Sequence, residues 1–74
     1  MLNKEETLCF AKYCGGYATA LEIAAEDLTK LLCKTYERNL RSAINDFLDE
    51  LKENARIYGA RAEKLAAQAE KLDH

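Results

Sequence analysis

Three cysteines and one histidine are the side chains in this 74-residue chain best suited to nucleophilic chemistry or soft-metal binding. Cys9 and Cys14 are separated by four residues and Cys33 is distant from both, a spacing that matches no zinc or redox motif. His74 is the last residue, so we expect neither a Cys–His catalytic pair nor a histidine-based metal site. The sequence therefore predicts a protein that is not an enzyme and that uses no metal and no cofactor.

Basic side chains recur at helical spacing in the middle of the chain, at Lys30, Lys34, Arg38 and Arg41. A nucleic-acid backbone or an acidic protein could dock on such a face. Glu26 and Glu37, however, lie four residues before Lys30 and Arg41, which is the pairing that stabilises a solvated helix surface. We favour the solvated surface and keep nucleic-acid binding as the alternative.

An acidic cluster follows, made of Asp46, Asp49, Glu50 and Glu53. These carboxylates could dock a basic partner or mimic phosphates. At the start of a helix they would also interact favourably with the positive end of the helix dipole. We favour the dipole and solubility interpretation, although four acids exceed what a helix start needs.

The composition is that of a helical bundle or coiled coil, with 49% hydrophobic residues, 32% charged residues and no proline. The net charge of −2 gives no overall field that would attract the chain to nucleic acid or anionic lipid. Lys4, Glu5 and Glu6 interrupt the start, and no uncharged run reaches membrane-spanning length. We expect no signal peptide, no membrane partner and no small-molecule substrate. Because the chain has three thiols and no export signal, we expect the protein in the reducing cytoplasm.

Two heptad patterns of apolar residues, here called seams, run through the chain in different phases. The first seam comprises Phe10, Cys14, Tyr17, Leu21, Ala24, Leu28, Leu31 and Thr35. The second comprises Ile44, Leu48, Leu51, Ala55, Tyr58, Ala62, Leu65, Ala69 and Leu72. The pattern stops and restarts between about residues 36 and 43. It predicts one helical domain, 1–74, with a first helix over about 4–37 and a second over about 42–72.

Two positions allow more than one interpretation. Gly15-Gly16 is the natural place to break the first helix, yet the apolar phase continues across it, which favours a kink over a loop. Asn39 can end a helix in the left-handed conformation and Ser42 can cap the next one. We therefore prefer a turn near Asn39 to a single uninterrupted helix.

Small and large residues alternate along the second seam, which allows two helix axes to approach closely. A parallel dimeric zipper would more often carry β-branched residues where this chain has alanine, so an antiparallel or four-helix arrangement is favoured. The layer chemistry resembles that of small homodimeric helical-hairpin bundles. We predict an all-α fold, a long antiparallel helical hairpin forming a four-helix bundle as a homodimer. The bundle seam would consist of Leu48, Leu51, Ala55, Tyr58, Ala62, Leu65 and Ala69.

The first helix carries more apolar side chains than one neighbouring helix can cover. Tyr17 and Tyr58 fall on seams and are expected in the core, whereas Tyr13 and Tyr36 lie beside them. If the apolar side chains that one neighbour cannot cover stayed exposed, they would form a patch of a kind that soluble monomers avoid. The candidate interface residues are Phe10, Tyr13, Tyr17, Ile23, Leu32 and Tyr36.

These observations predict a small helical protein that acts by binding proteins, with a second copy and another protein as partners. It would be an adaptor or regulator, or a small inhibitor of a larger protein or complex of the kind that phages and mobile elements encode. The alternative is a nucleic-acid-associated regulator that uses the basic face around Lys30 and Arg41.

Overall fold

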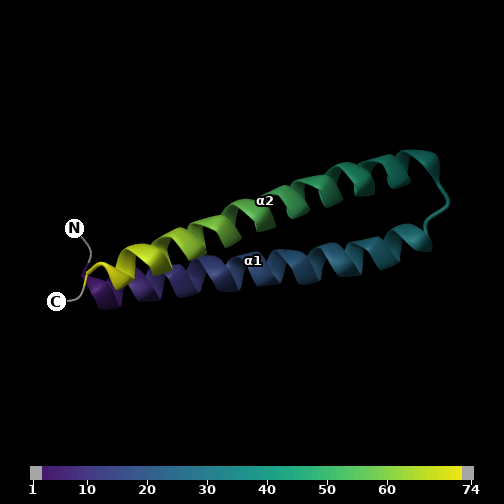
Figure 1. The fold of residues 1–74 in the computed structure, drawn as a ribbon. Helices are drawn as coiled ribbons and strands as arrows, with labels where there is room; N and C mark the ends of the chain where they lie inside the picture. Colours follow the sequence, from purple (N-terminus) through teal and green to yellow (C-terminus); the bar gives the residue numbers. More distant parts are fainter. Residues whose placement is uncertain (1–2, 73–74) are drawn as a thin grey trace.

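The computed structural model describes residues 3–72 and shows two long α-helices packed side by side as an antiparallel hairpin (Figure 1). Helix α1 spans Lys4–Cys33 and helix α2 spans Arg38–Glu70. Residues 34–37 form the turn, and the start of α1 lies beside the end of α2 at the far end (Figure 1). The described residues contain no strand. The all-α hairpin predicted from the two seams is confirmed.

Helix α1 is unbroken through Gly15 and Gly16, so no loop divides it there, in agreement with the continuous apolar phase. Both glycines have negative φ values. Each glycine costs about 1 kcal/mol in a helix interior. Packing of α1 against α2 offsets this cost, and Gly15 lies in that contact, where an added Cβ would be 3.7 Å from the Cβ of Ala62.

The turn comes earlier than the sequence predicts. Glu37 is the N-cap of α2, and its carboxylate accepts hydrogen bonds from the backbone N–H groups of Asn39 (3.1 Å) and Leu40 (2.6 Å). Asn39 therefore lies in the first turn of α2 and does not end α1. The guanidinium of Arg41 reaches back and donates to the carbonyl oxygens of Leu32 (2.8 Å) and Thr35 (2.7 Å). These side chains satisfy the helix ends, so among the described residues no left-handed residue is needed.

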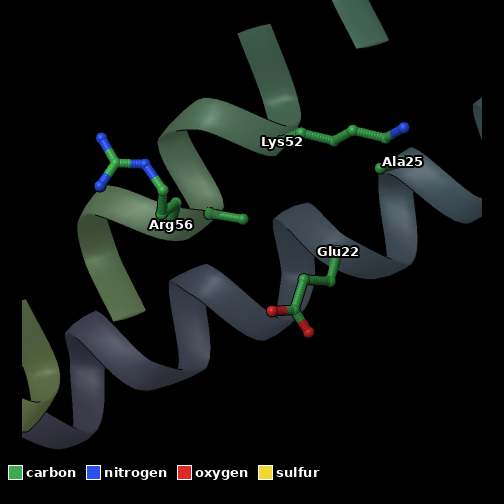
Figure 2. Close-up of a pocket in the computed structure, with 5 residues that line it drawn as sticks. Glu22, Ala25, Lys52 and Arg56 are labelled. Atoms are coloured by element: carbon green, nitrogen blue, oxygen red, sulfur yellow. The ribbon is translucent and has the colours of Figure 1, made fainter. Parts of the chain in front are cut away.

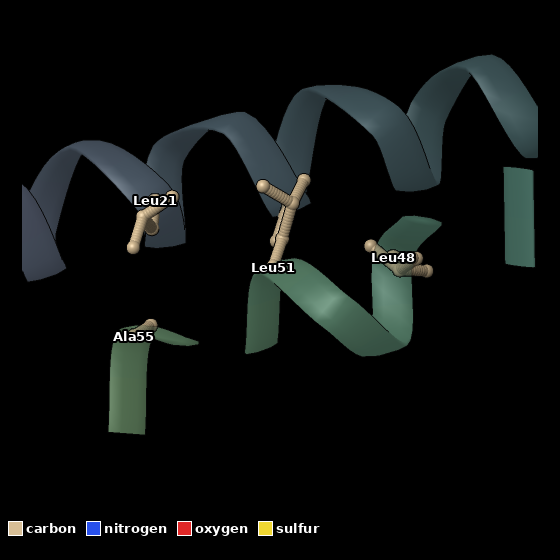
Figure 3. Packing of buried hydrophobic residues seen from close by; sticks show 5 residues of the cluster. Leu21, Leu48, Leu51 and Ala55 are labelled. Carbon is tan, nitrogen blue, oxygen red and sulfur yellow. The ribbon is translucent and has the colours of Figure 1, made fainter. Parts of the chain in front are cut away.

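The layer between the helices is built largely from small side chains. The buried apolar residues are Ala11, Cys14, Ala18, Leu21 and Ala25 of α1, and Ile44, Leu48, Leu51, Ala55 and Ala69 of α2. Figure 3 shows Leu21 reaching from α1 toward α2 and Leu51 reaching from α2 toward α1. Larger side chains thus alternate with alanines along the contact, which keeps the two helices close.

Half of the first seam is assigned wrongly by the sequence. Cys14, Leu21 and Thr35 are buried as expected, but the other buried apolar positions of α1 are the alanines at 11, 18 and 25. The predicted members that are exposed instead are Phe10, Tyr17, Ala24 and Leu31. The reason is steric. The two helices lie so close together that alanine side chains fit between them, whereas the aromatic rings that the seam assigned to the core do not.

The hairpin exposes much more surface than a closed molecule of its mass. Its Cα atoms span 57 × 14 × 14 Å, and the radius of gyration is 16.6 Å, against about 11 Å for a compact chain of this length. Its accessible surface is 5826 Å², against about 4,600 Å² for an average folded monomer. No large side chain within residues 3–72 is fully buried. The hairpin therefore has only a thin core.

Candidate functional site

The burial pattern divides the exposed residues between two sides of the hairpin. Residues one position before and two positions after each buried alanine of α1 lie on the same side of that helix. Each of these two offsets corresponds to a fixed rotation about the helix axis. The same offset from Leu48, Ala55 and Ala62 identifies the matching side of α2. The two sets meet: Phe10 and Arg61 line one shallow hollow, and Leu31 and Phe47 line another.

This side, which we call the aromatic face, carries large apolar groups from both helices: Phe10, Tyr13, Tyr17, Leu31 and Phe47. Their exposed fractions range from 48% for Tyr17 to 73% for Tyr13. Half-buried Ile57 lies between them in α2. Exposed large apolar groups gathered on one side are typical of a binding surface.

Contacts between rings hold the middle of the aromatic face in place. The rings of Tyr17 and Tyr58 meet edge to face, with centroids 4.7 Å apart and an interplanar angle of 90°. The guanidinium carbon of Arg61 lies 4.9 Å from the centre of the Tyr58 ring, a cation–π contact. The two hollows lie on either side of this cluster along the hairpin. The face is therefore largely formed in the isolated hairpin.

The opposite side is mainly polar. A shallow pocket there is lined by Glu22, Ala25, Lys52, Ala55 and Arg56. Figure 2 shows the long side chains of Lys52 and Arg56 extending in different directions from α2. Arg56 also bonds Glu53, with Nε 3.2 Å from the carboxylate. This hydrogen bond and the attraction between the two opposite charges lower the pKa of Glu53 and raise the pKa of Arg56.

The structure separates the six candidate interface residues. Phe10, Tyr13 and Tyr17 lie together on the aromatic face, and Leu32 is half-buried between the helices. Ile23 lies on the surface of α1 turned away from α2, and Tyr36 is 91% exposed in the turn.

Two residues of the aromatic face, Leu31 and Phe47, are missed by sequence reasoning. The seam assigns Leu31 to the core, and it gives Phe47 no role. The usable signal is that alanine or leucine recurs every seven residues at 11, 18, 25 and 32, which would move the seam by one residue.

The predicted basic cluster is divided by the turn. Its four members lie around the turn end of the hairpin: Lys30, Lys34, Arg38 and Arg41. Lys30 belongs to the last turn of α1 and Arg38 is the first residue of α2. Arg41 is already bonded to two backbone carbonyl groups of the α1 end. The row of cations expected on one continuous helix is therefore not formed.

The predicted acidic cluster lies inside α2 and does not open it. Its members, Asp46, Asp49, Glu50 and Glu53, are all exposed. The first turn of α2 contains no acidic residue, so the helix-dipole explanation for the cluster is wrong. Glu50 has the offset of the aromatic face, so one of these acids lies on its rim.

The predicted bundle seam lies against α1. Leu48, Leu51, Ala55 and Ala69 are buried and the remaining members are half-buried, namely Tyr58, Ala62 and Leu65. The three cysteines are free thiols, with Cys14 buried and Cys9 and Cys33 exposed. Within residues 3–72 no group of metal-binding side chains gathers, and His74 lies outside the described residues. In the same part of the chain, neither helix combines the length and apolar character that crossing a membrane requires.

Comparisons of the chain with protein-family models, curated proteins and solved structures found no match. The aromatic face is the feature of the described structure from which a function can be argued.

Proposed function

We propose that this hairpin is a non-enzymatic protein-binding module that docks through its aromatic face. The observation that supports this function is the group of five large apolar side chains exposed on one side of the rod, whereas the other side is mainly polar and exposes Leu8. Aromatic residues are enriched in the buried centres of protein interfaces. Burial of this face would remove the apolar surface that the thin core leaves in water.

Docking would use apolar contacts for affinity and charges for orientation. The hollow lined by Leu31 and Phe47 and the one lined by Phe10 can each receive an apolar side chain of a partner. Asp27 and Lys64 line these same hollows, so their charges would select the partner's orientation. An adaptor, a regulator or a small inhibitor would act in this way, by covering a surface of a larger protein.

Site-specific photo-cross-linking in the cells that express the protein tests this proposal. A photoreactive phenylalanine analogue replaces Tyr13 on the aromatic face, and a matched variant carries it at Arg56 on the polar side. We expect discrete protein adducts from position 13 and few from position 56. Adducts of equal yield from both positions, or none from position 13, would contradict the proposal.

A further inference from the structure

We infer that the occupant of the aromatic face is a second copy of this hairpin, turned end for end. The inference rests on the proposed function only in taking the aromatic face as a protein interface. It adds the identity of the partner, its orientation and the charged pair that sets the orientation.

The face of α1 is complementary to itself when it is reversed. Tyr17 and Ala24 lie at equal distances from the midpoint between residues 20 and 21, and so do Phe10 and Leu31. A reversed second α1 therefore places Tyr17 opposite Ala24 and Phe10 opposite Leu31. Large groups then meet smaller ones, and Ala20, which shares the face, allows the helices to approach closely at the centre.

The face of α2 has the same property, with charge added. Glu50 and Lys64 are both exposed and have the offset of the aromatic face, and Ile57 lies midway between them. They are about 21 Å apart along the helix, since α-helices rise about 1.5 Å per residue. A reversed copy brings Glu50 of each chain to Lys64 of the other, with Ile57 against Ile57.

One twofold axis serves both helices, because the two midpoints lie at the same height in the hairpin. Tyr17 contacts Tyr58, and Gly15 lies beside Ala62, so the middle of α1 lies beside residues 55–57 of α2. The same contacts place Asp27 at the height of Glu50. A dimer with turn beside turn would therefore bring Asp27 of one chain to Glu50 of the other, and like charges would repel. The charges favour the reversed pair.

The exposed area agrees with a second copy as occupant. The surface in excess of a compact monomer is about 1,200 Å² per chain, from 5826 Å² observed. Standard interfaces bury about 800 Å² per partner and obligate homodimers bury more. A standard dimer interface is smaller than this excess, and pairing the two faces would form a four-helix bundle.

Charge reversal followed by sedimentation equilibrium tests the reversed pair. The native chain is expected to be a dimer. Glu50→Lys and Lys64→Glu each create two like-charge contacts in the reversed dimer and should weaken it by about tenfold or more at low salt. The double variant exchanges the charges and should recover the native affinity. Asp49→Lys is the matched control, because it makes the same charge change away from the face and should leave dimerisation unchanged.

The possible results separate the alternatives. Stronger dimerisation of Glu50→Lys would overturn the reversed pair and indicate turn beside turn, where the introduced ammonium group meets Asp27 of the other chain. A native chain that is monomeric while position 13 still cross-links to another protein would overturn this inference alone. A monomer that forms no adduct would remove the proposed function as well. If a single variant unfolds, circular dichroism must show recovery of helix in the double variant, and failure of that recovery refutes the pairing.

Discussion

Ala62 lies against Gly15 of α1, and enlarging it should destabilise the hairpin. A Cβ added to Gly15 would lie 3.7 Å from the Cβ of Ala62, which is ordinary van der Waals contact, so the Ala62 side chain faces the α1 backbone there. Leucine at position 62 adds three carbon atoms on the α1 side of α2. The side chain must then leave its preferred rotamer or push α1 away. Overpacking of this kind costs about 1–3 kcal/mol.

The measurement is urea unfolding followed by circular dichroism, at equal protein concentration for native and variant chains. The matched control is Ala60→Leu, the same substitution at an exposed position of the same helix. We expect the control to change the free energy of unfolding by less than about 0.5 kcal/mol. An Ala62→Leu variant as stable as the control would refute the close approach of α1 and α2 at Gly15.

Three further predictions concern the helix interior, the turn and the thiols. Gly16→Ala should raise the free energy of unfolding by about 0.5–1 kcal/mol in the same assay, because a Cβ there meets nothing within 4 Å and alanine favours the helix. A loss of stability would show that α1 is not helical there. Arg41→Ala should lower it by about 1–2 kcal/mol, since two hydrogen bonds from a cation to backbone carbonyls disappear, whereas Arg38→Ala should have little effect. Maleimide labelling read by mass spectrometry should modify Cys33 rapidly and buried Cys14 only on unfolding; rapid labelling of Cys14 in the folded protein would contradict its burial.

The second helix is predictable from the sequence because its two sides differ strongly. Its apolar positions alternate with charged ones, so only one phase of the heptad puts apolar groups inward. Ile44, Leu48 and Leu51 accordingly lie in the core. The first helix is harder, because apolar residues occupy neighbouring positions such as Phe10 and Ala11. Hydrophobicity favours the ring as the buried group, whereas the spacing between the helices admits only the methyl group.

The turn is hard to place from the sequence because its determinants act over several residues. Glu37 caps α2 through its side chain, although asparagine, aspartate and serine are the usual N-caps. Arg41 satisfies carbonyl groups at Leu32 and Thr35, a contact that exists only once the chain has reversed. A segment without glycine or proline therefore offers little local signal, and sequence reasoning favours Asn39 instead. The proposed pairing of Glu50 in one chain with Lys64 in the other likewise cannot be derived until the alignment of α1 with α2 is known.

The two ends of this rod differ, because the turn forms one end and the start of α1 and the end of α2 form the other. A fluorescent domain or affinity tag fused at either terminus would extend from the end of the rod where the start of α1 lies beside the end of α2 (Figure 1). The turn lies at the opposite end of the 57 Å long axis. Such attachments would therefore lie away from the turn, and two hairpins paired end for end would hold their attachments at opposite ends of the pair.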